Sequence, residues 1–224
     1  MKFSQRLYEA AKPIWEKSHS HPFVQGIGDG SLDIEKFKFF MCQDYIYLID
    51  YSRLFALGSL KASDLTTMQV FAKMLHVTLD EEMSLHRAYA KRLGISEEEL
   101  EATKPAPTTL AYSSYMLNIA QRGSLKELLA AIMPCTWSYY EIGLRLSEIP
   151  GAREHEWYGE WIRMYESDEF GAVAQWQIQL IDELTASSTE KELQELEEIF
   201  LTTSRFEYMF WDMSFEQTSW PMED

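Results

Sequence analysis

The stretch DIEKFKFFMCQDYIYLIDYSRLFALGSLK, residues 33–61, decides the fold class of this chain. It is apolar on almost every side, as expected for a helix buried at the centre of a bundle. Asp33 is a good N-cap residue, and Leu32 and Phe37 are placed to pack against each other across the first turn. The pattern predicts one buried central helix with a length of about 40 Å.

The segments on both sides of this helix have a helical period, and none shows the alternation of a strand. Pro13 is expected to kink the first of them. The stretch GIGDGS (26–31) is expected to break the chain, and the acidic stretch 94–107 to form a surface connection. We therefore expect an all-α fold, in one domain over residues 1–224, with about eight helices over roughly 4–18, 33–61, 64–94, 108–122, 124–148, 154–166, 168–184 and 189–213.

Composition limits the classes of partner. Hydrophobic residues make up 46% of the 224 residues, which is typical of a globular protein. Twenty Lys and Arg against 36 Asp and Glu give a net charge of −16. This charge repels phosphate backbones and anionic lipids, so we expect neither nucleic acid nor a membrane as partner. The first residues, MKFSQRLYEAAK, lack the apolar run of a signal peptide, and a cytoplasmic protein is expected.

Two carboxylates lie on helix faces that are otherwise apolar. Glu207 lies within the aromatic run RFEYMFWDM, where burial would raise its pKa and make it a candidate proton donor. The alternative is that Glu207 turns outward and pairs with Arg205. Asp44 lies in the middle of the central helix, one turn before Tyr47. It is either functional or a structural carboxylate held by tyrosine hydroxyls.

Cys135 is one of only two cysteines, and it follows Pro134 directly. The proline removes a helix hydrogen bond and bends the helix beside the thiol, and Tyr139 lies one turn further along the same face. A lone cysteine in an apolar helix is more often a core residue than a nucleophile, and no His or Lys lies nearby in the sequence to favour a thiolate. Cys42 is expected to be a core residue.

Tyrosines are distributed over several predicted helices, and a buried phenol needs a hydrogen-bond partner. A pocket lined by tyrosines and two carboxylates would provide such partners. It would suit a flat, nitrogen-rich heterocycle, because rings stack on its faces and carboxylates accept from its N–H groups. Ordinary core packing remains the alternative for each of these residues: Tyr47, Tyr51, Tyr112, Tyr115, Tyr139, Tyr140 and Tyr165.

A carboxylate-and-histidine metal site is an alternative, because Glu81, Glu82 and His86 are close in sequence and Glu141 lies on the Cys135 helix. A di-iron bundle needs histidines on at least two helices, and the segment 168–184 has none. We therefore interpret EEMSLH (81–86) as a solvated helix face with an i,i+4 pair. No metal and no cofactor are expected.

Six motifs follow one another along the chain: HPFVQGIGDGSL (21–32), QDYIYL (43–48), AYSSYML (111–117), MPCTWSYYEIG (133–143), WIRMYESDEF (161–170) and SRFEYMFWDM (204–213). With them, nearly the whole chain resembles the TenA family, the thiaminase II or aminopyrimidine aminohydrolase proteins, in its cysteine-containing type. The resemblance implies a haem-oxygenase-like helical bundle, which is usually a homotetramer.

The resemblance also implies an activity in thiamin salvage. It would be the hydrolysis of 4-amino-5-aminomethyl-2-methylpyrimidine to the hydroxymethylpyrimidine with release of ammonia, and of thiamin to hydroxymethylpyrimidine and thiazole. The sequence marks no second basic or phosphate-binding subsite, so we expect the aminopyrimidine to be the better substrate. The alternatives are a metal-dependent oxidase on the same fold and a pyrimidine-binding or regulatory protein without turnover.

The matching motifs imply roles for individual residues. Cys135 would add to the pyrimidine ring, and Glu207 would protonate a ring nitrogen. Asp44 would hold the exocyclic amine and the adjacent nitrogen. The remaining roles are for aromatic residues: Tyr112 would orient Glu207 or the thiol, and the walls around the ring would come from Tyr47, Tyr139, Tyr165 and Phe210.

Overall fold

The computed structural model describes residues 2–221, and all regular secondary structure in this range is helical. The all-α prediction is confirmed. The helices are α1 (Phe3–His19), α2 (Pro22–Asp29), α3 (Ile34–Lys61), α4 (Leu65–Val77), α5 (Met83–Arg92), α6 (Glu97–Ala102), α7 (Pro107–Arg122), α8 (Leu125–Ser147), α9 (Gly159–Tyr165), α10 (Asp168–Leu184) and α11 (Glu190–Glu216). A π-helical turn, Thr78–Glu82, joins α4 to α5, and a 3-10 turn, Ala152–Glu154, precedes α9.

The central helix predicted over residues 33–61 is α3. Asp33 caps it by accepting the backbone N–H of Glu35 at 2.9 Å. Its apolar residues are buried on several sides, because α3 packs against α4, α5, α7, α8 and α11. This packing explains why the sequence of α3 is apolar almost all round.

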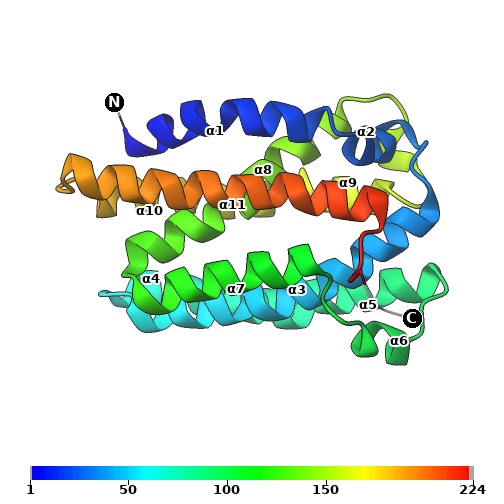
Figure 1. Ribbon diagram of the computed structural model, residues 1–224, viewed down its shortest axis with the longest axis horizontal. Helices are drawn as coiled ribbons and strands as arrows, with labels where there is room; N and C mark the ends of the chain where they lie inside the picture. The colour runs from blue at the N-terminus through cyan, green and yellow to red at the C-terminus, as the bar shows by residue number, and fades with distance from the viewer. Residues whose placement is uncertain (1, 222–224) are drawn as a thin grey trace.

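Helix α8 connects the two halves of the bundle. In Figure 1 it crosses between a group that contains α1, α10 and α11 and a group that contains α3, α4 and α7. Its N-terminus has a capping box, in which Ser124 and Glu127 hydrogen-bond to each other's backbone N–H. Pro134 lies inside α8, one residue before Cys135. Because α8 contacts both groups, its side chains reach the centre of the molecule.

Two segments expected to be connections contain short helices. The stretch GIGDGS was expected to break the chain, but α2 continues through Gly26 and Gly28 and ends at Gly30, whose φ of 77° is left-handed. The stretch 94–107 contains α6, which starts at a capping box formed by Ser96 and Glu99. Helix α1 runs on through Pro13.

The predicted helix over 64–94 is interrupted by the π-helical turn Thr78–Glu82. A π turn inserts an extra residue and changes the face on which the following residues lie. Leu79, within this turn, is 47% exposed, whereas Thr78 and His86 are buried. The prediction of one uninterrupted helix over 64–94 was therefore wrong. The π turn changes which residues after it face the interior of the bundle.

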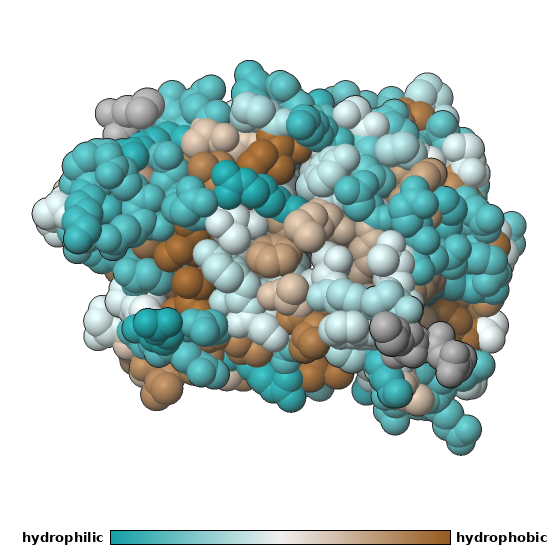
Figure 2. Space-filling view, viewed as in Figure 1, coloured by the Kyte–Doolittle hydropathy of each residue, from teal (hydrophilic) through white to brown (hydrophobic). Residues whose placement is uncertain are grey.

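The molecular surface is mainly hydrophilic on the face shown in Figure 2, with small apolar patches between the polar side chains. No helix among residues 2–221 combines the length and the apolar composition needed to span a membrane.

Gly143 lets α8 pass close to the end of α9. A Cβ atom at this position would lie 2.5 Å from the carbonyl carbon of Tyr165 and 2.6 Å from the backbone nitrogen of Glu166. Gly143→Ala is expected to lower the free energy of unfolding by about 2 kcal/mol, because backbone atoms cannot move aside as a flexible side chain could. Urea denaturation measures this. Leu144→Ala, at the exposed neighbouring position, is the control, and equal stabilities for the two variants would contradict the prediction.

Candidate functional site

A cavity of about 490 Å³ lies between α3, α4, α8 and α10. This volume is within the range of small-molecule sites. Most of its wall is aromatic or aliphatic, and its charged side chains are Asp44, Lys73, Glu82 and Glu169. Lys73 and Glu169 are exposed and mark the mouth, whereas Asp44 is buried at the inner end.

The structure brings the residues predicted for the site together, although they come from five helices. Five of the eight line the cavity: Asp44, Tyr47, Cys135, Tyr139 and Tyr165. The other three, Tyr112, Glu207 and Phe210, form a second layer behind this wall. The Tyr47 ring lies 5.2 Å from the Tyr112 ring and 5.8 Å from the Phe210 ring. The Tyr139 and Tyr165 rings meet edge to face at 4.9 Å. These ring contacts fix the shape of the inner cavity.

Glu207 is buried, with only 2% of its surface exposed. Its Oε1 accepts a hydrogen bond from the Tyr112 hydroxyl at 2.5 Å. The outward alternative is wrong, because Arg205 pairs with Glu198 at 3.1 Å instead. Burial raises the pKa of Glu207 to about 8, and the hydrogen bond from Tyr112 and the nearby Cys135 thiol only partly offset this effect. Glu207 is therefore mostly protonated at neutral pH.

The Cys135 thiol lies at the cavity wall, close to both Glu207 and Tyr47. Burial raises the pKa of the thiol well above its ordinary value, and the nearby Glu207 carboxyl raises it further. The free protein therefore holds a thiol at this position, not a thiolate. Cys42 packs against the hydrophobic core but is only half-buried.

His86 and Glu82 are site residues that the sequence analysis missed. The interpretation of EEMSLH as a solvated face is wrong for both, since His86 is buried and Glu82 lines the cavity. The π turn before α5 places them on the inner face. The i,i+4 spacing of these two polar residues was a signal, but it could not show the face on which they lie.

Asp44 finds its partner in His86 rather than in a tyrosine. The Nε2 atom of His86 lies 2.8 Å from Oδ2 of Asp44. Both side chains are buried, and they come from α3 and α5, 42 residues apart. The expectation that tyrosine hydroxyls hold a structural Asp44 is therefore not what the structure shows.

The four residues considered as metal ligands do not form one cluster, although Glu82 and His86 lie close to each other beside Asp44. Glu141 lies on another face of α8, where its carboxylate is 3.9 Å from His19. Within residues 2–221, no three His, Cys, Asp or Glu side chains are arranged to hold a metal ion.

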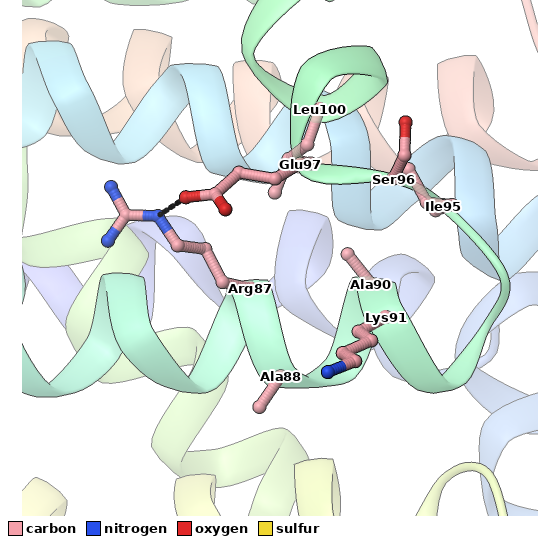
Figure 3. Close-up of a pocket in the computed structure, with 8 residues that line it drawn as sticks. All are labelled: Arg87, Ala88, Ala90, Lys91, Ile95, Ser96, Glu97 and Leu100. Atoms are coloured by element: carbon pink, nitrogen blue, oxygen red, sulfur yellow. Dashed lines mark ion pairs between the residues drawn. The ribbon is translucent and has the colours of Figure 1, made fainter.

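A second hollow, of about 390 Å³, lies between α5 and α6. Figure 3 shows that Arg87 and Glu97 point toward each other across it, with their charged atoms 3.8 Å apart. Both side chains are exposed, so their charges are solvated and screened. The hollow lacks the buried reactive groups of the first cavity, which is the better candidate site.

The fold and the cavity together define a class: a helical bundle with an aromatic-walled cavity for a small molecule, lined or backed by a thiol and buried carboxyl groups. The chain belongs to the TENA/THI-4/PQQC family, whose model matches residues 8–217. The resemblance to TenA proteins is confirmed.

Similar proteins agree in sequence and in structure. An aminopyrimidine aminohydrolase of Halalkalibacterium halodurans is 64% identical over 220 residues, which cover 98% of each chain. The solved structure of a TenA homologue from P. horikoshii OT3 has a TM-score of 0.88 and 30% identity, and the match covers 96% of this chain and 99% of that one. A domain of unknown function from Shewanella denitrificans OS217 with a haem-oxygenase-like fold shares only 15% identity. Its TM-score of 0.74, over 95% of this chain and 92% of that chain, confirms the expected fold.

Proposed function

We propose that this protein is an aminopyrimidine aminohydrolase of thiamin salvage. It hydrolyses 4-amino-5-aminomethyl-2-methylpyrimidine to the hydroxymethylpyrimidine and ammonia, and thiamin to hydroxymethylpyrimidine and thiazole. The observation that carries the proposal is the contact between the Cys135 thiol and the Glu207 carboxyl beside the aromatic cavity. A nucleophile and a proton donor, both next to a flat binding space, are what this reaction requires.

The inner cavity holds the pyrimidine between aromatic rings. Tyr47, Tyr139 and Tyr165 line this space, and Phe210 supports Tyr47 from behind. The Asp44 carboxylate accepts an N–H of the exocyclic amine. Because the rings pack against one another, the pyrimidine enters a preformed slot and little side-chain freedom is lost on binding.

In the first step the Cys135 sulfur forms a bond to the unsubstituted ring carbon beside the protonated nitrogen. Glu207 gives its proton to that nitrogen, and the thiol proton moves to Glu207 as the sulfur attacks. The thiol has a raised pKa, so proton removal has to accompany the attack. Glu207 contacts the thiol and can serve both transfers, while Tyr112 holds its Oε1.

Addition interrupts the aromaticity of the ring and allows the leaving group to depart. Electrons from the exocyclic amine pass through the ring to the methylene carbon, and the bond to its substituent breaks. The aminomethyl group, protonated at neutral pH, leaves as ammonia, and the thiazolium of thiamin leaves as neutral thiazole. Asp44 stabilises the positive charge that develops on this amine. Water then adds to the methylene carbon and loses a proton. Finally the ring nitrogen gives up its proton, the carbon–sulfur bond breaks, and the thiol is restored.

One assay separates this function from its alternatives. The purified protein is incubated with the aminopyrimidine, released ammonia is measured, and the metal content is determined. Ammonia release that survives a chelator supports the proposal. Activity that depends on about two metal ions per chain would identify an oxidase-type site, and binding of the pyrimidine without turnover would identify a binding protein.

The preferred substrate is expected to be the aminopyrimidine. A thiazolium leaving group would lie toward the mouth, where the charged side chains Lys73 and Glu169 are exposed and contribute little binding energy. We expect kcat/KM for the aminopyrimidine to exceed that for thiamin by at least about tenfold, which corresponds to about 1.4 kcal/mol. Equal values on one enzyme preparation would show that the outer cavity recognises the thiazolium.

The proposal also includes a cytoplasmic homotetramer. The tetramer is supported by the resemblance to TenA proteins and by large apolar side chains that are exposed where α3 ends and α4 begins, Leu60, Leu65 and Met68. Cys42 and Cys135 are both unpaired, which fits a reducing compartment.

A further inference from the structure

The Asp44–His86 pair lies at the inner end of the cavity. Asp44 is 4% exposed and His86 is 2% exposed. Asp44 lines the cavity, whereas His86 lies behind it and contacts Oδ2 of Asp44 at 2.8 Å. His86 therefore reaches a ligand only through Asp44.

The hydrogen-bond partners of His86 determine where its protons are. Nδ1 lies 2.9 Å from the backbone carbonyl oxygen of Glu82. A carbonyl oxygen only accepts, so Nδ1 carries a hydrogen. With the hydrogen on Nδ1, a neutral imidazole has no hydrogen on Nε2, and a carboxylate oxygen has none either. The contact between His86 Nε2 and Asp44 Oδ2 therefore needs a second proton between these two atoms. The pair is thus either an imidazolium with a carboxylate or a neutral imidazole with a carboxylic acid.

The surroundings favour the ionised form of the pair. Burial by itself lowers the pKa of His86, but the hydrogen bond and charge of Asp44, together with Glu82, outweigh burial and raise it. Burial raises the pKa of Glu82 to about 7, with Asp44 adding to the effect. An ionised Asp44 in an aromatic cavity would be costly without a nearby positive charge. His86 provides that charge.

We propose that His86 is a positioning residue that fixes the orientation of the Asp44 carboxylate and balances its charge. With Oδ2 held by His86, Oδ1 is the oxygen that accepts from the exocyclic amine of the pyrimidine. The positioned carboxylate also stabilises the charge on that amine when the leaving group departs. This inference rests on the proposed function for its substrate, and on the Asp44–His86 contact for its geometry.

The test is a double-mutant cycle with Asp44→Asn and two substitutions of His86. His86→Ala is expected to lower kcat/KM for the aminopyrimidine by about tenfold to 100-fold, and to weaken binding of hydroxymethylpyrimidine in calorimetry. His86→Gln keeps a neutral N–H donor and is expected to recover part of this loss. His76→Gln is the matched control, because His76 forms an exposed i,i+4 pair with Asp80 outside the cavity. It should leave both quantities unchanged.

If His86 acts through Asp44, its substitution has little further effect once Asp44 is Asn, so the double variant resembles Asp44→Asn alone. If instead the effects of the two single substitutions multiply in the double variant, His86 acts independently of Asp44, and the inference is overturned. If His86→Ala fails to fold, the cycle of Asp44→Asn with His86→Gln distinguishes the same two outcomes. The proposed function and the inference can fail separately. If the wild-type protein releases no ammonia but binds hydroxymethylpyrimidine with an affinity that depends on His86 and Asp44 in this way, the proposed function is refuted and the inference stands.

Discussion

Cys135→Ser is expected to lower turnover of the aminopyrimidine by about a thousandfold or more. A serine hydroxyl is a much weaker acid than a thiol, and Glu207 has a pKa of about 8, too low for it to remove the hydroxyl proton effectively. The substitution changes one atom at the cavity wall, so the fold and the binding of hydroxymethylpyrimidine should be nearly unaffected. Steady-state kinetics and calorimetry on the same preparation measure the two effects.

Cys42→Ser is the control for this substitution. Cys42 is half-buried against the core outside the cavity, so this variant should keep its activity. Near-normal turnover by Cys135→Ser would falsify covalent addition. A loss of pyrimidine binding equal to the loss of turnover would also contradict the prediction, because it would show that the thiol serves recognition.

Glu207→Gln is expected to lower kcat by about a hundredfold or more, with a much smaller effect on pyrimidine binding. The amide of Gln can hydrogen-bond to a ring nitrogen but cannot protonate it. Because burial holds the pKa of Glu207 at about 8, the wild-type protein has its donor protonated below that pH. Its activity should therefore fall as the pH rises through about 8, since the ionised carboxylate has no proton to give.

The pH profile of the variant supplies a second measurement. Glu207→Gln should lose the decrease in activity above pH 8 that is assigned to this group. Glu198→Gln is the matched control, because Glu198 lies on the same helix but is exposed and pairs with Arg205. It should change neither kcat nor the profile. An unchanged alkaline decrease in Glu207→Gln would assign that decrease to another group.

The sequence alone determined the fold class and the identity of the helices that carry the site. The apolar residues around α3 required a buried central helix, and α3 has the predicted Asp33 cap. The buried position of Glu207 followed from the apolar residues spaced along α11, because a carboxylate on that stripe shares its burial. Such features are local, since they depend on residues one to three turns apart in one helix.

The tertiary structure decided which polar groups meet. Asp44 and His86 are 42 residues apart, and Tyr112 and Glu207 are 95 apart, so no helical period could pair them. The π turn Thr78–Glu82 gave no sequence signal, yet it places His86 on the inner face of the bundle. The raised pKa of Glu207 likewise depends on the packing of several helices around one carboxyl group, because burial from water is a property of the assembled bundle and not of one segment.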